Sequence, residues 1–410
     1  MSSSKPTIHL FTRNYPFGRN ESFVEEEISR LQQYGEVVVV PAFRDHSDPR
    51  KLPNGVQLET SLAGCSMLSG LKSFSVMMSV LSQLPGEIIN RGVKSLRIKS
   101  QFAMWSYILR ISRFTHWILR SDAGKGVHKA MSFWSNSEAV GLALATIHRT
   151  ELRFVSRLHG FDIWEKNNFY GYLPFRALLY EHALFLLPCS AIGAKYLRST
   201  VSNADRVVVA PLGVDRLLES NYEKCNRTIE EAVILTCSSG DPVKRLSLIA
   251  ETIVVLAKKN PDRSWTWIHL GEGQEQFQAK LKEAPENLKV ELPGPVSRLE
   301  VFRYHRDRCP DVFVNLSSSE GIPVTIMEAM SMGTPVVATA AGGTGEIVDS
   351  TIGELLPVEI DSNNSAHAIR NVINTSHAKR TAAIERWRNA ASIEVAQKVL
   401  DRIVPQLIRD

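Results

Sequence analysis

The chain has 410 residues, of which 44% are hydrophobic and 22% charged, with a formal net charge of +5. These values exclude a disordered or fibrous protein and indicate two or three globular domains. The five cysteines are scattered and have no CxxC spacing, which argues against a disulfide framework or a zinc site and favours a reducing compartment. The N-terminus lacks the apolar core of a signal peptide, and no segment has the apolar length of a membrane span.

Short β-branched runs alternate with helical patterns along the chain. The expected strands are 7–12, 36–42, 153–159, 184–190, 206–212, 232–238, 264–270, 311–317 and 334–340. Several are apolar at nearly every position, which is typical of a parallel sheet covered by helices on both faces. The sequence therefore predicts an α/β protein with an N-terminal Rossmann-like domain over 1–215, a polar linker over 216–231, a second such domain over 232–375 and a helical tail over 376–410.

Residues 61–120 are basic and rich in aromatic side chains. Their basic residues are Lys72, Arg91, Lys94, Arg97, Lys99, Arg110, Arg113 and Arg120, and Glu87 is the only acidic one. Such an amphipathic stretch can lie on an anionic membrane surface, or it can pack on the domain core with a solvated basic face. Both interpretations stay open. Nucleic-acid binding is disfavoured, because no recognition motif accompanies the charge.

The most informative block is 316–349, where a buried strand is followed by a turn, a helix and a second buried strand. The turn at Glu320 leads into a helix that ends near Gly333. In open α/β sheets, ligands bind at the carboxyl ends of the strands, and a helix N-terminus there attracts phosphate. Glu328 lies two turns into the helix, where its carboxylate can accept hydrogen bonds from a ribose diol. Alone, each glutamate is more simply a solvated residue; together in this block they favour a ligand site.

The E-x7-E spacing within SxxEGxPxxxxEAMxxGxPVVAT resembles the donor-site signature of family 4 glycosyltransferases, which have the GT-B fold. The resemblance implies two Rossmann-like domains facing a cleft, with a C-terminal helix that crosses back to the N-domain. It places Glu320 beside the transferred sugar and Glu328 on the ribose. The implied donor-binding main chain comprises Gly321, Ile322, Pro323 and Val324.

CSSGDPVKRLSLIAE, residues 237–251, resembles the phosphate-binding loop of the same family. It implies that Lys244 neutralises the donor diphosphate and that Arg245 assists. Many relatives carry an arginine five residues before this lysine, where this chain has Ser239, so one expected phosphate contact is missing. In HLGEGQ, residues 269–274, Gly271 and Gly273 are expected near the nucleotide base.

RLHGFDIWEKNNFYGYLPFR, residues 157–176, resembles the HGxD element of bacterial exopolysaccharide and colanic-acid-type transferases. The match implies that His159 lies near the donor sugar and Asp162 on the acceptor side, although a histidine at a strand end is often structural. Residues 11–31 resemble the same subgroup and place Gly18 near the diphosphate or acceptor. Glu25, Glu26 and Glu27 are expected in the first turn of a helix. Trp134 either lines the acceptor site or belongs to the core.

These matches imply retaining glycosyl transfer from a nucleotide-diphospho-sugar to a saccharide or lipid-linked saccharide in surface polysaccharide biosynthesis. No cofactor or metal is expected, and the chain has no D-x-D sequence. The expected location is cytoplasmic, peripheral on the inner face of the membrane. The alternatives are a non-catalytic nucleotide-sugar-binding protein, favoured only by Ser239, or another GT-B enzyme such as an epimerase. A nicotinamide dehydrogenase is disfavoured, because the first strand–loop lacks G-x-G-x-x-G.

Overall fold

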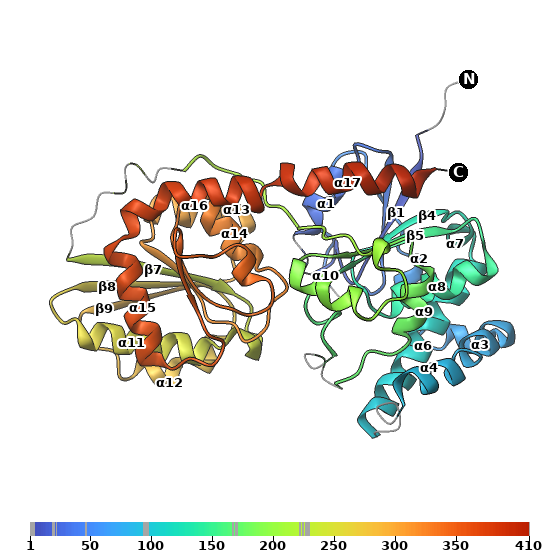
Figure 1. The fold of residues 1–410 in the computed structure, drawn as a ribbon, viewed down its shortest axis with the longest axis horizontal. Coiled ribbons are helices and arrows are strands. Elements are labelled where there is room, and N and C mark those ends of the chain that lie inside the picture. The colour runs from blue at the N-terminus through green and yellow to red at the C-terminus, as the bar shows by residue number, and fades with distance from the viewer. Residues whose placement is uncertain are drawn as a thin grey trace. The chain divides into compact units, whose positions relative to one another are not determined.

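The computed structural model describes residues 5–18, 21, 23–45, 47–92, 98–165, 168, 171–220, 223, 225 and 230–409. The chain forms two compact units (Figure 1). Unit 1 comprises Met1–Ala210 and Gln397–Asp410, and unit 2 comprises Pro211–Ala396. Over the described residues, each unit is built on a six-stranded sheet.

The sheet of unit 1 has the order β3-β2-β1-β4-β5-β6, and all neighbouring strands are parallel. Its strands are β1 (Thr7–Thr12), β2 (Glu36–Pro41), β3 (Gln57–Leu58), β4 (Lys129–Ser132), β5 (Arg153–Leu158) and β6 (Phe185–Pro188). Its helices are α1 (Val24–Leu31), α2 (Ser61–Gly64), α3 (Phe74–Leu81), α4 (Leu84–Arg91), α6 (Ile98–Arg120), α7 (Asp122–Lys125), α8 (Ser137–His148), α9 (Arg176–His182), α10 (Ala191–Arg198) and most of α17 (Ile393–Ile408).

The sheet of unit 2 has the order β12-β11-β10-β7-β8-β9 and is also parallel. Its strands are β7 (Glu231–Ser238), β8 (Ser264–Gly271), β9 (Leu288–Gly294), β10 (Val312–Asn315), β11 (Val336–Thr339) and β12 (Gly353–Leu356). Helices α11 (Leu246–Lys259), α12 (Gln278–Leu281) and α15 (Ser362–Asn374) cover one face, and α13 (Arg298–Arg308), α14 (Val324–Ser331) and α16 (Ser376–Ala390) cover the other (Figure 1).

Both sheets reverse their strand order at the same topological point. In unit 1 the reversal lies between β1 and β4, and in unit 2 it lies between β7 and β10. Loops that leave two neighbouring strands in opposite directions open a crevice at the carboxyl edge, and ligands of doubly wound sheets bind there. The fold therefore offers one such switch point in each unit.

The expected strand over 206–212 is wrong, because this segment forms only an isolated bridge between Val207 and Leu186. The list of expected strands lacks β3, β4, β9 and β12. Strand β4 is a central strand of only four residues, whereas β3, β9 and β12 lie at sheet edges. An edge strand is partly exposed, so it lacks the continuous apolar run of a central strand. The sequence LKVELPG of β9, with its mixed burial, shows this directly.

The expected tail over 376–410 is divided between the two units. Helix α16 packs within unit 2, where the buried Arg380 donates hydrogen bonds to the carbonyls of Pro310 at 3.0 Å and Gly333 at 3.3 Å. Only residues 397–410 belong to unit 1. There Asp401 of α17 accepts a hydrogen bond from Tyr34, which follows α1.

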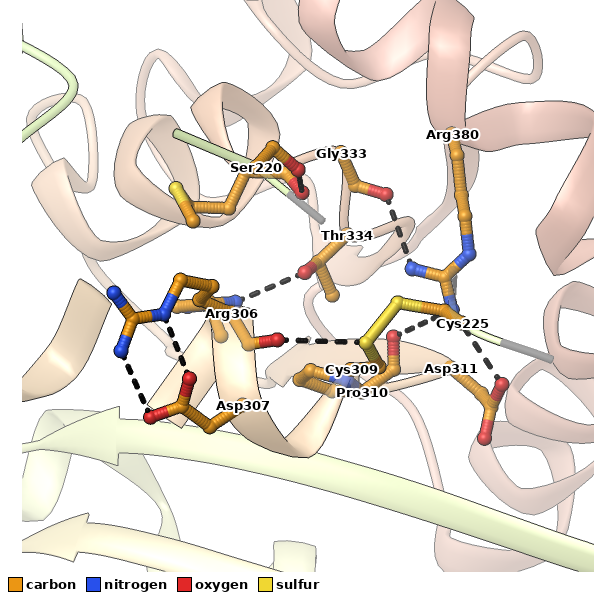
Figure 2. The surroundings of a disulfide bond; sticks show 12 residues. Ser220, Cys225, Arg306, Asp307, Cys309, Pro310, Asp311, Gly333, Thr334 and Arg380 are labelled. Atoms are coloured by element: carbon orange, nitrogen blue, oxygen red, sulfur yellow. Dashed lines mark hydrogen bonds and ion pairs between the residues drawn. A yellow bond between two sulfur atoms is a disulfide. The ribbon is translucent and has the colours of Figure 1, made fainter. Parts of the chain in front are cut away.

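Cys225 and Cys309 form a disulfide (Figure 2), which corrects the expectation drawn from the scattered cysteines. The two residues are 84 positions apart, so their proximity arises from the fold and leaves no spacing pattern. Cys309 follows α13, and Cys225 lies in the segment expected as the linker. Part of 216–231 lies outside the described residues. The disulfide links the segment around Cys225 covalently to the end of α13 in unit 2. Because the protein contains a disulfide, its cysteines no longer indicate a reducing compartment.

Candidate active site

A small pocket lies at the switch point of unit 2. It is lined by residues at the carboxyl ends of β7 and β10, in the segments that follow them and in α11: Thr236, Cys237, Ser238, Lys244, Ile249, Val314, Asn315 and Ser317. The position is the one at which doubly wound sheets bind ligands.

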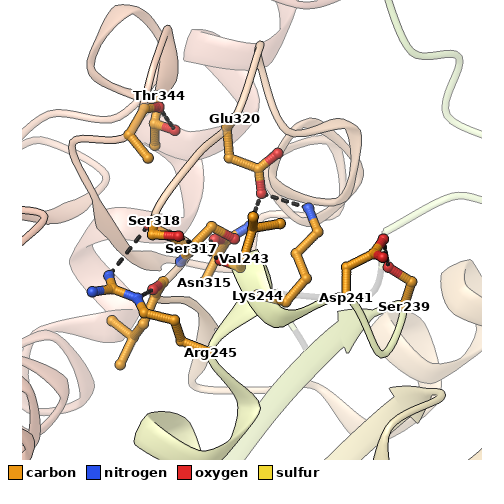
Figure 3. Close-up of polar contacts among 12 residues, drawn as sticks. Ser239, Asp241, Val243, Lys244, Arg245, Asn315, Ser317, Ser318, Glu320 and Thr344 are labelled. Carbon is orange, nitrogen blue, oxygen red and sulfur yellow. Dashed lines mark hydrogen bonds and ion pairs between the residues drawn. The ribbon is translucent and has the colours of Figure 1, made fainter. Parts of the chain in front are cut away.

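Lys244 and Glu320 meet beside this pocket (Figure 3). The lysine Nζ lies 2.7 Å from Glu320 Oε1, and the side chains are 22% and 10% exposed. Asn315, which the sequence motifs did not include, donates to the same oxygen at 3.4 Å. The Ser318 amide donates to the Val243 carbonyl at 2.8 Å and holds the two loops together. The arrangement presents a partly buried cation whose carboxylate partner an incoming phosphate can replace.

The turn that carries Glu320 is shaped by Gly342, whose φ is +56°. A Cβ at Gly342 would lie 1.9 Å from the Glu320 carbonyl oxygen, so only glycine allows this approach. The Gly343 amide donates to the Gly321 carbonyl at 2.7 Å. Pro323 is the N-cap of α14, so the positive end of that helix dipole begins directly after the Glu320 turn. Residues Ile322 and Val324 thus flank the helix start, and their expected contact with the donor remains a prediction.

Glu328 lies on α14, is 4% exposed, and pairs with Arg298, whose Nε is 2.8 Å from Oε1. Arg298 also donates to the Asp215 carbonyl at 3.2 Å. Arg298 stands 30 positions before Glu328 at the start of α13, and no spacing pattern connects the two. Arg298 is therefore a candidate functional residue that sequence reasoning missed.

The Cys237 thiol lies within the electrostatic influence of both charged pairs, through Glu328 of one pair and Lys244 of the other. Burial raises the pKa of its thiol to about 12, and the Glu328 carboxylate adds to this effect while Lys244 opposes it. The thiol is therefore protonated at neutral pH, so it is a small neutral group of the pocket wall and not a nucleophile.

Arg245 and Ser239, both assigned to the donor site from the sequence, make contacts within the protein, and their contact with a donor remains a prediction. The guanidinium of Arg245 donates to main-chain carbonyls, among them Val358 at 2.7 Å and Ser317 at 3.3 Å, so it fastens the end of β10 (Figure 3). The Ser239 hydroxyl donates to Asp241 at 2.8 Å.

Gly271 and Gly273 permit the end of β8 to approach the loop after β7. Their φ angles are +131° and +88°. A Cβ at Gly271 would lie 1.8 Å from the Ser238 carbonyl oxygen, and one at Gly273 would lie 2.8 Å from the Gly240 Cα. Both glycines therefore shape the pocket rim, and the expected contact with a nucleotide base remains a prediction.

His159 lies in unit 1 directly after β5 and is 7% exposed. Among the described residues, neither ring nitrogen has a hydrogen-bond partner, and Nδ1 is 3.7 Å from Asp162 Oδ2. Asp162 is completely buried and accepts hydrogen bonds from the His159 and Ser135 amides. Burial alone would raise the pKa of Asp162, but its interactions with the nearby His159 side chain and amide and the charge of Arg176 lower it. Asp162 thus orders the end of β5, and its expected place on the acceptor side of the site remains a prediction.

Trp134 lies after β4, half-buried, with its ring centroid 4.3 Å from that of His159 and 5.1 Å from that of Phe161. Phe161 is 40% exposed. His159, Trp134 and Phe161 therefore form one aromatic cluster near the switch point of unit 1.

Gly18 lies in the loop after β1 and has φ +72°. Its amide donates a hydrogen bond to the Ser47 hydroxyl at 2.6 Å.

Two parallel α/β units of this strand order, the second with a cationic pocket at its switch point, define the GT-B fold class of glycosyltransferases. Residues 231–375 match the family described as "Glycosyl transferases group 1". This part of the chain therefore forms a glycosyltransferase group 1 domain, which confirms the expectation from the E-x7-E motif.

Curated relatives include the putative colanic acid biosynthesis glycosyltransferase WcaL of Salmonella typhimurium, 24% identical over 259 residues. The amylovoran biosynthesis glycosyltransferase AmsK of Erwinia amylovora is 25% identical over 219 residues. The alignments cover 61% and 51% of this chain and span 63% and 52% of those proteins.

Solved structures share the fold over nearly the whole chain. Sucrose-phosphate synthase from Thermosynechococcus elongatus has a TM-score of 0.71 at 16% identity, covering 98% of this chain and 99% of that chain. HepE from Anabaena, in complex with UDP-glucose, has a TM-score of 0.65 at 14% identity, covering 98% and 100%. At these identities the likeness establishes the fold alone.

Proposed function

We propose that this protein is a retaining glycosyltransferase that moves a sugar from a nucleotide-diphospho-sugar to a saccharide or lipid-linked saccharide in surface polysaccharide biosynthesis. The observation that carries the proposal is the Lys244–Glu320 pair, 2.7 Å apart at the β7/β10 switch point of a glycosyltransferase group 1 domain. The names of the WcaL and AmsK relatives support the polysaccharide context.

In the proposed reaction, Lys244 and the N-terminus of α14 stabilise the charge that grows on the departing diphosphate. The bond between the sugar C1 and the phosphate oxygen breaks, and a bond from C1 to the acceptor oxygen forms on the same face. The acceptor hydroxyl gives its proton to the departing phosphate, so the anomeric configuration is retained. Glu320 lies beside the sugar, and Glu328 exchanges Arg298 for the ribose hydroxyls. Lys244 and the helix dipole supply the positive charge, so we expect no cofactor or metal requirement.

The donor site is tested with Lys244→Ala, Glu320→Gln and Glu328→Ala. Transfer is expected to fall by on the order of 10²–10³ in the first two variants. Lys244→Ala loses the positive charge at the departing diphosphate, and Glu320→Gln loses the negative charge beside the sugar, where positive charge grows in the transition state. Glu328→Ala is expected to weaken nucleotide binding roughly tenfold or more, since it loses charged hydrogen bonds to the ribose. Calorimetry with UDP, GDP and ADP measures binding. Assays in EDTA measure transfer, and NMR of the product identifies the anomer.

Lys258→Ala is the matched control, because Lys258 is an exposed lysine of α11 that pairs only with Glu283 in the described contacts, at 3.3 Å. It is expected to behave as wild type. Wild-type transfer by Lys244→Ala would overturn the site. Nucleotide binding without transfer to any acceptor would instead support the non-catalytic binding protein.

We also propose that unit 1 attaches peripherally to the cytoplasmic face of an anionic membrane. Within the described ranges, no helix has the length and apolarity to cross a bilayer. Helices α3, α4 and the first half of α6 lie together at one end of unit 1 (Figure 1). They carry exposed apolar side chains, here called together the apolar patch: Phe74 (80%), Ile89 (79%), Ile98 (74%), Phe102 (66%) and Trp105 (62%). The second half of α6 is buried, including Ile111 and Phe114, and fits the alternative of a helix packed on the core, whereas the exposed apolar side chains of its first half support the membrane proposal.

The charges around the apolar patch favour an anionic partner. Glu87, the single acidic residue of 61–120, is 3% exposed, whereas Lys72 and Lys99 are exposed. Arg113 is an exception among the basic residues, since it is 2% exposed and donates to the Ala42 carbonyl. Lys94, Arg97 and the Arg91 side chain lie outside the described residues. An apolar surface with exposed lysines and no exposed acid fits anionic headgroups over acyl chains.

Phe102→Ser/Trp105→Ser tests the membrane proposal by co-sedimentation with phosphatidylglycerol vesicles. Removing two inserted aromatic side chains is expected to weaken binding by about tenfold or more. Ile147→Ser, which changes a side chain 45% exposed on α8, is the control and is expected to bind normally. Equal binding of all three proteins would refute the patch as the membrane contact.

A further inference from the structure

The switch point of unit 1 is occupied by a side chain of the protein itself. Glu21 accepts hydrogen bonds from the main-chain amides of Arg13 at 3.1 Å and of Asn14 and Tyr15 at 2.7 Å each. The indole Nε1 of Trp134 donates to the same carboxylate. The three amides follow β1 and Trp134 follows β4, so Glu21 bridges the two strands between which the sheet order reverses. Glu21 is 7% exposed.

Consecutive main-chain amides that converge on one acceptor form an anion-binding nest. In dinucleotide-binding units of this topology, the loop after the first strand is where phosphate binds. Here the anion is internal. Glu21 has φ +67°, a conformation uncommon for a residue other than glycine. The four hydrogen bonds to the carboxylate offset the cost of that backbone conformation.

Through Trp134, Glu21 reaches the aromatic cluster of unit 1. The indole ring lies between Glu21 at its N–H and the rings of His159 and Phe161, at 4.3 Å and 5.1 Å. A tryptophan whose N–H is bound to a buried carboxylate has a fixed ring orientation. The exposed edge of the cluster, Phe161 and Trp134, is a surface on which an apolar sugar face can pack.

We propose that Glu21 is a positioning residue: it acts as an internal anion that closes the phosphate-type nest of unit 1 and holds Trp134 as the platform for the acceptor saccharide. The acceptor role rests on the proposed glycosyltransferase function, whereas the role as internal anion does not. The two switch points therefore differ in chemistry. Unit 2 presents Lys244 to a phosphate, and unit 1 has its amides already neutralised and takes a sugar ring.

Glu21→Ala tests the internal anion by chemical rescue. The substitution empties the nest, so added acetate is expected to bind there and restore the tryptophan emission that the variant has lost. Glu21→Gln fills the same volume without the charge and is expected to show no acetate response. Glu21→Ala/Trp134→Phe lacks the indole whose emission is measured, so its emission is also expected not to respond to acetate. An acetate response equal in all three variants, or none in Glu21→Ala, would overturn the internal anion. This readout requires no transfer activity.

The positioning role is tested by acceptor kinetics in the same variants. Glu21→Ala is expected to lower kcat/KM for the acceptor by roughly 10- to 100-fold, the usual effect of removing a supporting residue, with partial recovery in acetate. Its UDP binding in unit 2 is expected to be unchanged. Trp134→Phe and Glu21→Ala/Trp134→Phe are expected to lose about as much as each other, because both changes act through one ring. Wild-type acceptor kinetics in Glu21→Ala, or additive losses in the double variant, would refute the positioning role.

Discussion

At the scale of single residues, His305 makes unit 2 sensitive to acid. Burial lowers the pKa of this imidazole to about 3, and the charge of Arg380 adds to the effect. Its Nδ1 lies 2.9 Å from the Thr334 hydroxyl, so the native state holds the neutral ring. An unfolded histidine binds a proton near pH 6.5. As the pH falls, the unfolded chain therefore gains a proton that the native state does not.

The resulting prediction is a loss of stability that begins near pH 6.5 and continues toward pH 3, with a slope of up to roughly 1.4 kcal/mol per pH unit from this residue. Urea unfolding of unit 2 at pH 7.5 and pH 5 measures it. His305→Gln is expected to flatten the pH dependence, whereas His367→Gln, at an exposed position of α15, is expected to leave it unchanged. A pH dependence identical in His305→Gln and wild type would contradict the assignment.

The same scale shows what the sequence alone can predict about the site. Lys244 and Glu320 stand 76 positions apart, and the two motifs that contain them already imply that they meet at one ligand. Other residues at the two switch points belong to no motif that would predict their contacts. Arg298 reaches Glu328 from a different helix, and Glu21 reaches Trp134 across 113 positions. A motif records residues close in sequence, and these contacts exist only after the sheet has formed.

At the scale of elements, most central strands were predictable and three of the four edge strands were not, because a strand buried on both faces is usually apolar throughout. The exceptions are the apolar edge strand β6, which was expected, and the central β4, whose four residues KAMS are too few and too mixed to stand out. Helix α1 shows a second limit. Its acidic first turn was expected from the helix dipole, but Glu27 is completely buried. Its carboxylate binds Arg157 of β5 at 2.7 Å and 2.9 Å and also pairs with Arg30. The two arginines keep the pKa of Glu27 low despite its burial. Glu27 therefore anchors the helix to the sheet.

At the scale of the whole molecule, the chain completes unit 1 only with its last described segment. Residues 397–410 belong to unit 1, although unit 2 precedes them in sequence. The arginine side chain of Arg153 and the ammonium group of Lys129 each donate to the Arg409 carbonyl at 2.8 Å. Four side chains of α17 have no exposed surface: Leu400, Ile403, Val404 and Leu407. The two units therefore differ in how they depend on the C-terminal helix.

Truncation after Ala396 is expected to unfold unit 1 and to leave unit 2 folded. Burial of a large aliphatic side chain contributes roughly 1.5–3 kcal/mol, so losing four of them removes an amount comparable to the whole stability of a typical domain. Hydrogen exchange is expected to show lost protection in β1 and β4 and retained protection in β7 and β10. UDP binding, which we assign to unit 2, is expected to persist. The full chain with Gln397→Ala loses the hydrogen bond to Tyr34 but keeps the apolar contacts, and it is expected to remain protected in both units. Full protection of β1 in the truncated protein would show that unit 1 is stable without its returning helix.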